Sequence, residues 1–344
     1  MAAQLLRAAE VSGQLTPHSA DKVYEGTVGS TGVSLAMLCR ARGYSAHIVM
    51  PSDQSSEKAS LLRKLGAEVT LVPPAAIVDR NQFVNRARSL ARQHSADPAK
   101  PGRGFFADQF ENDQNWQAHY AGTAPEILRQ CGPRGLDAFV AGAGTGGTLS
   151  GCARFLKRHL AGRLRVVLAD PPGSGLYNRV RYGVMFAPTE REAAHRRRHQ
   201  VDSIVEGIGI NRLTRNFEAG GMLIDDAVRV ADDEAMAMAR FLVEKEGLFV
   251  GSSSAVNCVA AVRTALSMGP GHRVVTILCD SGARHLSKFW ARAGDVGGSW
   301  DMTLADVLHS DSKTTSSVPP KTADGDDSET ALRASAAGET GPSR

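Results

Sequence analysis

A glycine-rich stretch with two hydroxyl side chains, Gly142-Ala-Gly-Thr-Gly-Gly-Thr148, follows an apolar run and precedes a helix-length segment. Glycines let the backbone approach a ligand closely, and the free N–H groups at a helix start bind anions. Thr145 and Thr148 add hydroxyl donors to the glycine amides. This donor set suits a phosphate monoester, which has three terminal oxygens to satisfy, so the stretch predicts a phosphate-binding turn.

The same turn has a second interpretation. Gly142-x-Gly144-x-x-Gly147 matches the dinucleotide fingerprint, and Asp170 ends the next apolar run 23 residues after Gly147. An acid near this position binds the ribose in nicotinamide-dependent enzymes. An NAD-dependent oxidoreductase is therefore an alternative that the turn alone leaves open.

Two further polar segments stand where strands meet helices or end. The segment Thr27–Gly32 separates strand-like Val23–Glu25 from helix-like Val33–Arg42, and its hydroxyls and amides suit a carboxylate, with a plain helix N-cap as the alternative. Ser281, in Asp280–Gly282, follows a strand-like run whose carboxyl end is a usual place for ligands.

Five motifs, in this order, resemble the cysteine synthase family, and in particular its fungal members. They are Glu25–Gly32, Asp108–Asn112, Gly142–Thr148, Gly251–Ser254 and Asp280–Gly282. The resemblance implies an α/β chain with the two-domain fold-type II (tryptophan synthase β-like) architecture and pyridoxal 5′-phosphate in the interdomain cleft. It also implies a homodimeric transferase or lyase of cysteine biosynthesis that converts O-acetylserine and sulfide to cysteine and acetate.

The resemblance also implies roles for individual residues, position by position. The implied cofactor contacts are Ser30, Gly144, Thr145, Gly146, Gly147, Thr148 and Ser281, and the implied contacts to the substrate carboxylate are Thr27, Gly29, Thr31 and Gln109. Ser281 would meet the pyridine nitrogen, where a neutral hydroxyl makes the ring a weaker electron sink than a carboxylate would. Val28 and Ser30 replace the serine and asparagine of the commonest family pattern, so we expect a weaker or water-mediated contact at Ser30. Gly251–Ser254 matches its motif loosely, and a packing or capping role is an equal alternative.

In the family, a Ser-x-Lys-Asp-Arg stretch opens the helix that this chain enters at Met1. The lysine that anchors the cofactor is therefore expected three positions before Met1, in a first domain truncated at its start, and the printed chain is expected to have negligible turnover. No other lysine replaces it: Lys22 precedes a strand at the wrong end, and Lys58 and Lys64 are predicted to be solvated on an amphipathic helix over 56–65. A non-catalytic protein that keeps a phosphate pocket and acts through a partner is the second alternative.

Apolar runs alternate with helix-length segments, the pattern of parallel βαβ units. Strands are predicted over 47–50, 68–72, 138–141, 166–169 and 274–278, and the last helix over 284–293. We expect one domain over 1–120 and a second over 121–298. The tail 299–344, without aromatics after Trp300 and rich in Ser, Thr, Asp and Gly, is predicted to be disordered.

Composition bounds the remaining questions. Of the net charge of +4, residues 301–344 carry −4 and the rest +8, which suits anionic ligands. The five cysteines lack CxxC pairs, which argues against zinc and disulfides and for a reducing compartment: the cytoplasm, or mitochondria if a targeting signal lies upstream. No stretch has the length of a membrane span. The basic run in 191–199 lacks interleaved aromatics, so we predict no nucleic-acid partner.

Overall fold

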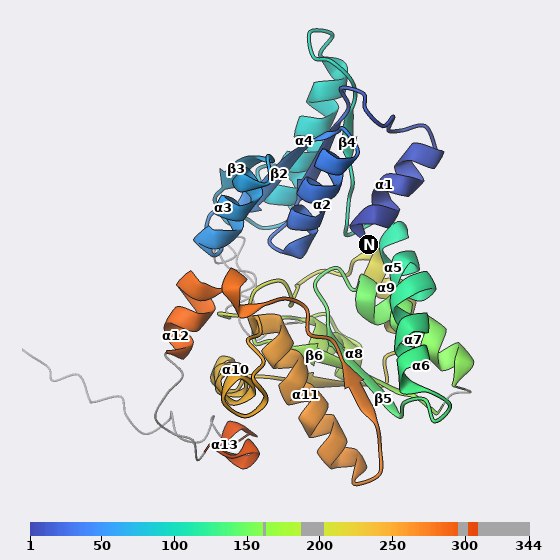
Figure 1. The fold of residues 1–344 in the computed structure, drawn as a ribbon, viewed down its shortest axis with the longest axis vertical. Coiled ribbons are helices and arrows are strands. Elements are labelled where there is room, and N and C mark those ends of the chain that lie inside the picture. The colour runs from blue at the N-terminus through green and yellow to red at the C-terminus, as the bar shows by residue number, and fades with distance from the viewer. Residues whose placement is uncertain (161–162, 187–202, 295–301, 309–344) are drawn as a thin grey trace, which may run out of the picture. The chain divides into compact units, whose positions relative to one another are not determined.

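The computed structural model describes residues 1–160, 163–186, 203–294 and 302–308, which build two four-stranded parallel sheets (Figure 1). The first has the order β3-β2-β1-β4, and the second has the order β7-β6-β5-β8. The strands are β1 (Lys22–Gly26), β2 (Ser45–Pro51), β3 (Glu68–Val72), β4 (Gly104–Phe106), β5 (Ala138–Gly142), β6 (Arg165–Asp170), β7 (Asp226–Arg229) and β8 (Val274–Thr276).

Helices make most of the connections between these strands. They are α1 (Ala2–Val11), α2 (Ser30–Ala41), α3 (Ser56–Lys64), α4 (Phe83–Ala96), α5 (Gln114–Ala118), α6 (Ala124–Cys131), α7 (Gly147–His159), α8 (Leu176–Tyr182), α9 (Arg215–Gly221), α10 (Asp232–Glu246), α11 (Ser252–Met268), α12 (Ala291–Ala293) and α13 (Leu304–Leu308). None of the helices in the described ranges is long and apolar enough to cross a membrane.

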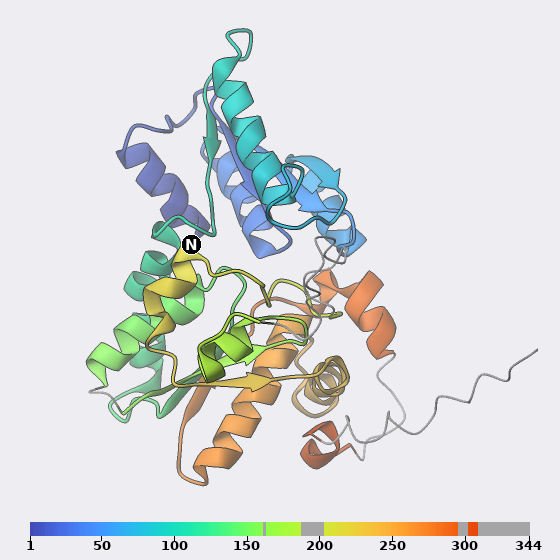
Figure 2. The same ribbon diagram turned by 180° about the vertical axis from the view of Figure 1, so that it is seen from behind.

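Both sheets are covered by helices on both faces, which explains their continuous apolar sequences. In the second sheet, alternate side chains enter different cores: Val140 and Val167 pack with residues of α10 and α11, whereas Phe139 and Val166 pack with residues of α7 and α8. In the first sheet, α2 and α4 lie on opposite faces, as the front and back views show (Figure 2).

The two sheets share one topology, and this topology fixes where a ligand can bind. In each sheet the first strand lies between the second and the fourth, so β1 separates β2 from β4 and β5 separates β6 from β8. In open parallel sheets, ligands bind outside the carboxyl ends of the strands at such a switch point, because the connections there diverge. The expected positions are the loops after Gly26 and after Gly142.

The strands predicted over 47–50, 68–72, 138–141 and 166–169 are confirmed, with the last strand ending at Thr276 rather than at 278. The predicted disorder of 299–344 is wrong for 302–308, where α13 forms and Val307 is buried against the core that contains α10. The rest of that tail, and the basic run 191–199, lie outside the described residues. The domain boundary near 120 stays a prediction.

Candidate active site

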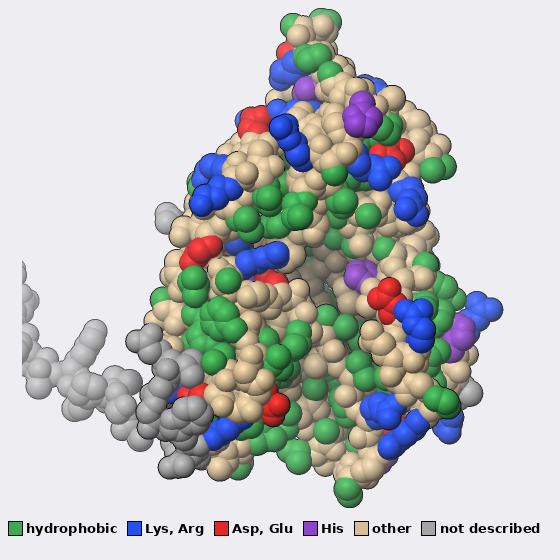
Figure 3. Space-filling model, viewed as in Figure 1, with side chains coloured by type: hydrophobic (Ala, Val, Ile, Leu, Met, Phe, Trp, Pro, Cys, Tyr) green, Lys and Arg blue, Asp and Glu red, His purple; other side chains and the backbone are tan. Residues whose placement is uncertain are grey.

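A cavity of about 620 Å³ lies at the switch points of both sheets. The molecular surface is hollowed between the elements of the two sheets (Figure 3). The lining of the cavity includes the loops that follow β1, β5 and β8, as the topology predicts. Nine of the eleven predicted site residues line it: Thr27, Gly29, Ser30, Thr31, Gln109, Gly144, Thr145, Gly146 and Thr148. Gly147 and Ser281 do not.

The glycines after β5 form a cup that larger residues could not make. A Cβ atom on Gly144 would lie 2.2 Å from the carbonyl oxygen of Gly207, and Gly146 has φ +83°, a left-handed conformation that favours glycine. Gly147 packs against Asn115, whose Oδ1 would lie 2.2 Å from an added Cβ, which explains why it lies behind the lining. Because α7 begins at Gly147, its first N–H groups have no intrahelical partners, and those that follow the Gly147 amide, which donates to Thr145 Oγ1, are available to an anion.

The cup's two hydroxyls are oriented by neighbouring side chains, and that of Thr145 keeps its proton for a ligand. Thr145 Oγ1 accepts hydrogen bonds from Asn115 Nδ2 at 3.0 Å and from the Gly147 amide at 3.3 Å, so its own O–H remains to donate. Thr148 Oγ1 lies 3.3 Å from Nε2 of His119. Burial lowers the pKa of His119 to about 4, so this imidazole is neutral near pH 7. The cup therefore fits the phosphate of pyridoxal 5′-phosphate.

Hydrogen bonds connect the loops after β1 and β4 next to the predicted carboxylate site, which is the Thr27 loop. Gln109 donates from Nε2 to the Gly26 carbonyl at 2.9 Å, and Glu25 accepts from the amides of Gly26 at 3.0 Å and Gln109 at 3.2 Å. Glu25 is fully buried, and this burial, with the nearby Asp108 carboxylate, raises its pKa to about 8. The Thr27 loop is thus held in place by buried hydrogen bonds between the end of β1 and the Gln109 loop.

Two predicted contacts have partners of their own within the protein. Ser30 Oγ accepts a hydrogen bond from Arg284 Nη1 at 3.0 Å. Ser281 is exposed, and its hydroxyl accepts from the Ala283 amide at 3.3 Å, whereas its neighbours Cys279 and Asp280 line the cavity. The role of Ser281 at the pyridine nitrogen therefore stays a prediction.

The Gly251–Ser254 segment has mainly a capping and packing role. Gly251 is the N-cap of α11, and Ser254 Oγ accepts from the Cys279 amide at 2.8 Å. Ser252 Oγ accepts from the Glu206 amide at 3.1 Å. Ser253 is the member of the segment that lines the cavity.

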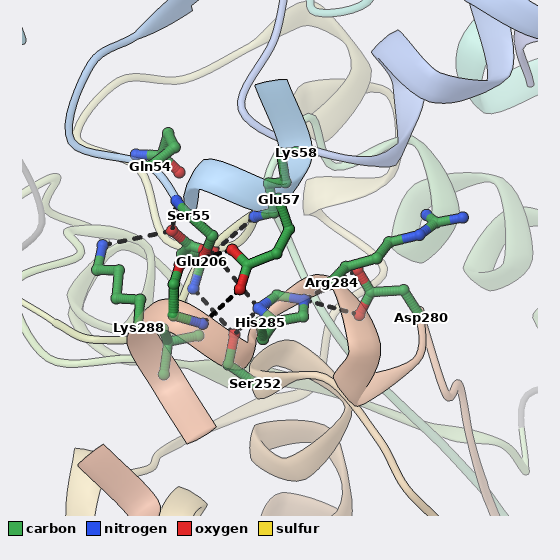
Figure 4. A network of polar contacts seen from close by, with 12 residues as sticks. Gln54, Ser55, Glu57, Lys58, Glu206, Ser252, Asp280, Arg284, His285 and Lys288 are labelled. Carbon is green, nitrogen blue, oxygen red and sulfur yellow. Dashed lines mark hydrogen bonds and ion pairs between the residues drawn. The ribbon is translucent and has the colours of Figure 1, made fainter. Parts of the chain in front are cut away.

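The prediction that Lys58 is solvated is wrong. Lys58 lines the cavity, is buried, and places Nζ 2.6 Å from Oε2 of Glu206, which is also buried (Figure 4). A signal for this existed in the sequence, because Lys58 lies one turn before Leu62 on the buried stripe of α3. Lys64 is exposed, as predicted.

Asp170, the residue on which the dinucleotide interpretation depends, is not available to a ribose. It is fully buried, does not line the cavity, and accepts a hydrogen bond from the Tyr177 amide at 2.7 Å near the start of α8. Burial raises its pKa to about 7. The geometry therefore does not favour an NAD site at this turn.

Comparison with known proteins gives the class of the chain. The family model described as "Pyridoxal-phosphate dependent enzyme" matches residues 1–280, and the chain belongs to this family. The chain is 63% identical to "Cysteine synthase 2" of Emericella nidulans over 318 residues, which cover 90% of this chain and 74% of the relative. It is 50% identical to "Putative mitochondrial cysteine synthase" of Saccharomyces cerevisiae, with 90% of this chain and 77% of the relative covered.

A solved structure has the same architecture. The O-acetylserine dependent cystathionine beta-synthase from Helicobacter pylori superposes with a TM-score of 0.68 at 32% identity, over 83% of this chain and 82% of that one. The predicted fold class, the enzyme class and the pyridoxal 5′-phosphate cofactor are therefore confirmed. So is the resemblance to fungal cysteine synthases.

Proposed function

We propose that this protein catalyses cysteine synthase-like β-replacement, in which O-acetylserine and sulfide give cysteine and acetate. The observation that supports this proposal most strongly is the shared cavity. A phosphate cup at the switch point of one sheet faces a hydroxyl-rich loop at the switch point of the other. A phosphorylated cofactor and an amino-acid carboxylate need such a pair of anion sites.

Each half of the cavity has its own task in this proposal. Gly144, Thr145, Gly146, Gly147 and Thr148 hold the cofactor phosphate through backbone N–H groups and hydroxyls. Thr27, Gly29, Thr31 and Gln109 hold the substrate carboxylate at the start of α2, where the helix dipole favours a negative charge. When bound, pyridoxal 5′-phosphate supplies the electron sink that allows the β-substituent to leave.

Ser30 and Ser281 are proposed to contact the cofactor ring. The contact of Ser30 Oγ with Arg284 supports a shared role, in which the guanidinium orients the Ser30 hydroxyl toward the cavity. Ser281 Oγ only accepts from the Ala283 amide, so its own O–H remains to donate to a ring nitrogen once the side chain turns toward the cavity.

Two measurements test the proposal. Calorimetric titration of the chain with pyridoxal 5′-phosphate and with NAD separates the cofactor classes, and binding of NAD alone would refute it. The second is an assay for cysteine from O-acetylserine and sulfide, run on the chain and on a form extended upstream to include the expected lysine. Cofactor binding without activity in both forms would favour the alternative of a non-catalytic phosphate-binding protein.

We also propose that the protein is a homodimer, that its substrate is a small amino acid, and that it is located in the cytoplasm. The name of the yeast relative supports mitochondria as the alternative location. Light scattering of the purified protein tests the dimer, and imaging of the tagged full-length gene product in cells tests the location. A monomer at micromolar concentration, or a tag confined to mitochondria, would overturn the respective statement.

A further inference from the structure

One buried carboxylate joins segments that belong to different sheets. Glu206 accepts hydrogen bonds from the Ser55 amide at 3.0 Å, from Ser55 Oγ at 2.8 Å and from Lys58 Nζ at 2.6 Å, all at the start of α3. On the opposite side, His285 Nδ1 and Lys288 Nζ each lie 3.4 Å from its oxygens (Figure 4). Burial raises the pKa of Glu206, but these cationic and hydroxyl donors outweigh it and hold the pKa well below its usual range.

His285 continues this chain of charges to the loop after β8. Its Nε2 lies 3.0 Å from Oδ2 of Asp280, so each ring nitrogen faces a carboxylate, and its side chain is 1% exposed. Carboxylates accept but do not donate, so the two carboxylates favour a proton on both ring nitrogens, and Nδ1 has a further polar neighbour in Ser252 Oγ at 3.5 Å. Burial lowers the pKa of His285, but the hydrogen bonds to Asp280 and Glu206 outweigh it and the pKa is raised, with Lys58 opposing them.

The segment 280–288 makes further contacts with the first sheet's helices. Glu57, in the first turn of α3, accepts from the Ser287 amide and Oγ, each at 2.5 Å. Arg284 donates to Ser30 at the start of α2. The segment therefore carries one proposed cofactor contact, Ser281, and binds another, Ser30.

We propose that Glu206 is a positioning residue that holds the segment 280–288 against the start of α3. It thereby keeps His285 protonated and fixes Ser281 and, through Arg284, Ser30. The significance for catalysis rests on the proposed function, because Ser30 and Ser281 matter only if a cofactor ring lies between them. The positioning itself is a property of the protein alone and can be tested without cofactor.

The experiment compares Glu206→Gln with Glu234→Gln in the full chain. Glu234 is a matched control, because its side chain is also 1% exposed and paired with an arginine, but it does not line the cavity. The first readout is hydrogen exchange of the hydrogen-bonded amides of the segment, among them those of Arg284, His285 and Ser287, followed by peptide mass spectrometry. The second is the titration of His285 by NMR, with Glu57, Lys58, Asp280 and Lys288 as the charged groups that face it or the Glu206 carboxylate.

We expect Glu206→Gln to accelerate exchange of these amides about fivefold, because loss of a charge-assisted contact favours local opening of the segment, and to lower the pKa of His285. Glu234→Gln should change neither. Exchange rates equal to those of the unmodified chain and an unchanged His285 titration in Glu206→Gln would overturn the proposal, even if the melting temperature fell, because ordinary packing loss would explain that. A third readout is the pyridoxal 5′-phosphate affinity, which should weaken about tenfold in Glu206→Gln. If the unmodified chain binds no pyridoxal 5′-phosphate while both other readouts respond, the positioning stands and the proposed function fails.

Discussion

Gly144→Ala should disable the phosphate cup while the protein still folds. The added Cβ would lie 2.2 Å from the Gly207 carbonyl oxygen, whereas ordinary contacts begin at 3.4 Å. The carbonyl oxygen belongs to the backbone and the position of the Cβ is fixed by the backbone, so neither can rotate away, and the two loops must separate by about 1 Å. This displacement moves the amides of Thr145 and Gly146 out of hydrogen-bonding geometry with a bound phosphate.

The size of the effect follows from the number of lost contacts. A hydrogen bond to a charged group contributes about 1.5–3 kcal/mol, and about 1.4 kcal/mol changes a binding constant tenfold. Loss of one such bond should therefore raise the dissociation constant of pyridoxal 5′-phosphate about 10- to 100-fold. The overpacked loop should also cost about 1–3 kcal/mol of stability. Calorimetry gives the affinity, and urea unfolding gives the stability.

Gly122→Ala is the control for this prediction. Gly122 lies in the π-helical turn His119–Thr123, which packs against α7, and nothing lies within 4 Å of an added Cβ. It should leave the affinity unchanged and raise the free energy of unfolding by about 0.4–1 kcal/mol, because alanine reduces the conformational freedom of the unfolded chain. If Gly144→Ala binds pyridoxal 5′-phosphate as tightly as Gly122→Ala does, the turn does not hold the phosphate.

Three further predictions concern buried groups outside the cup. The pKa of Glu25 rises from 4.5 to about 8 on folding, so between these pH values the folded state binds a proton that the unfolded state has lost. The free energy of unfolding should therefore fall as the pH rises from about 4.5 to about 8. The slope should be at most about 1.4 kcal/mol per pH unit. Glu25→Gln should flatten this slope in urea unfolding, and an unchanged slope would contradict the burial argument. Lys58→Met should lower the free energy of unfolding by about 3 kcal/mol, because it removes the closest cation from the buried Glu206 carboxylate. Lys64→Met on the same helix should change the free energy of unfolding by less than about 0.5 kcal/mol. Equal effects of the two substitutions would mean that Lys58 is solvated in solution. Val307→Ala in α13 should lower the free energy of unfolding, measured by differential scanning calorimetry, by about 1–2 kcal/mol. Val78→Ala is the control, because Val78 is 87% exposed and its truncation should change the stability very little. A neutral Val307→Ala would show that α13 does not pack on the core.

The parts of the molecule that the sequence predicted correctly are those that depend on local physics. A strand covered on both faces must be apolar throughout, so β2, β5 and β6 are evident as runs of Val, Ile, Leu and Ala. The cup after β5 has a local part, the positive φ at Gly146, whereas the close approach of Gly144 to Gly207 is visible in the sequence only as a glycine. Order in α13 could not be predicted, since a five-residue helix is unstable alone and forms only against the core that buries Val307.

The charged half of the cavity could not be predicted because its members are far apart in sequence. Lys58 and Glu206 are 148 residues apart, and no spacing rule relates them. The type of residue alone indicates a solvated lysine on a surface helix, whereas the spacing of Lys58 and Leu62 indicates the buried side of α3. Ser281 illustrates the reverse case, where a motif gives the residue but not the orientation of its hydroxyl, which here accepts from Ala283.

The distribution of charge in the cavity determines how it can bind an anion. Among the described residues that line it, the lysine and arginine side chains are Lys58, Arg212 and Lys288, and each has a carboxylate partner in Glu111 or Glu206. These cations are committed to the protein, so the phosphate must be held mainly by the N–H groups and dipole of α7 and by the cup's hydroxyls. Such donors are fixed by backbone geometry rather than by flexible side chains. This explains why the cup depends on glycine at Gly144, where a single methyl group would move the donors, and why salt should weaken phosphate binding less than it would at a lysine-lined site.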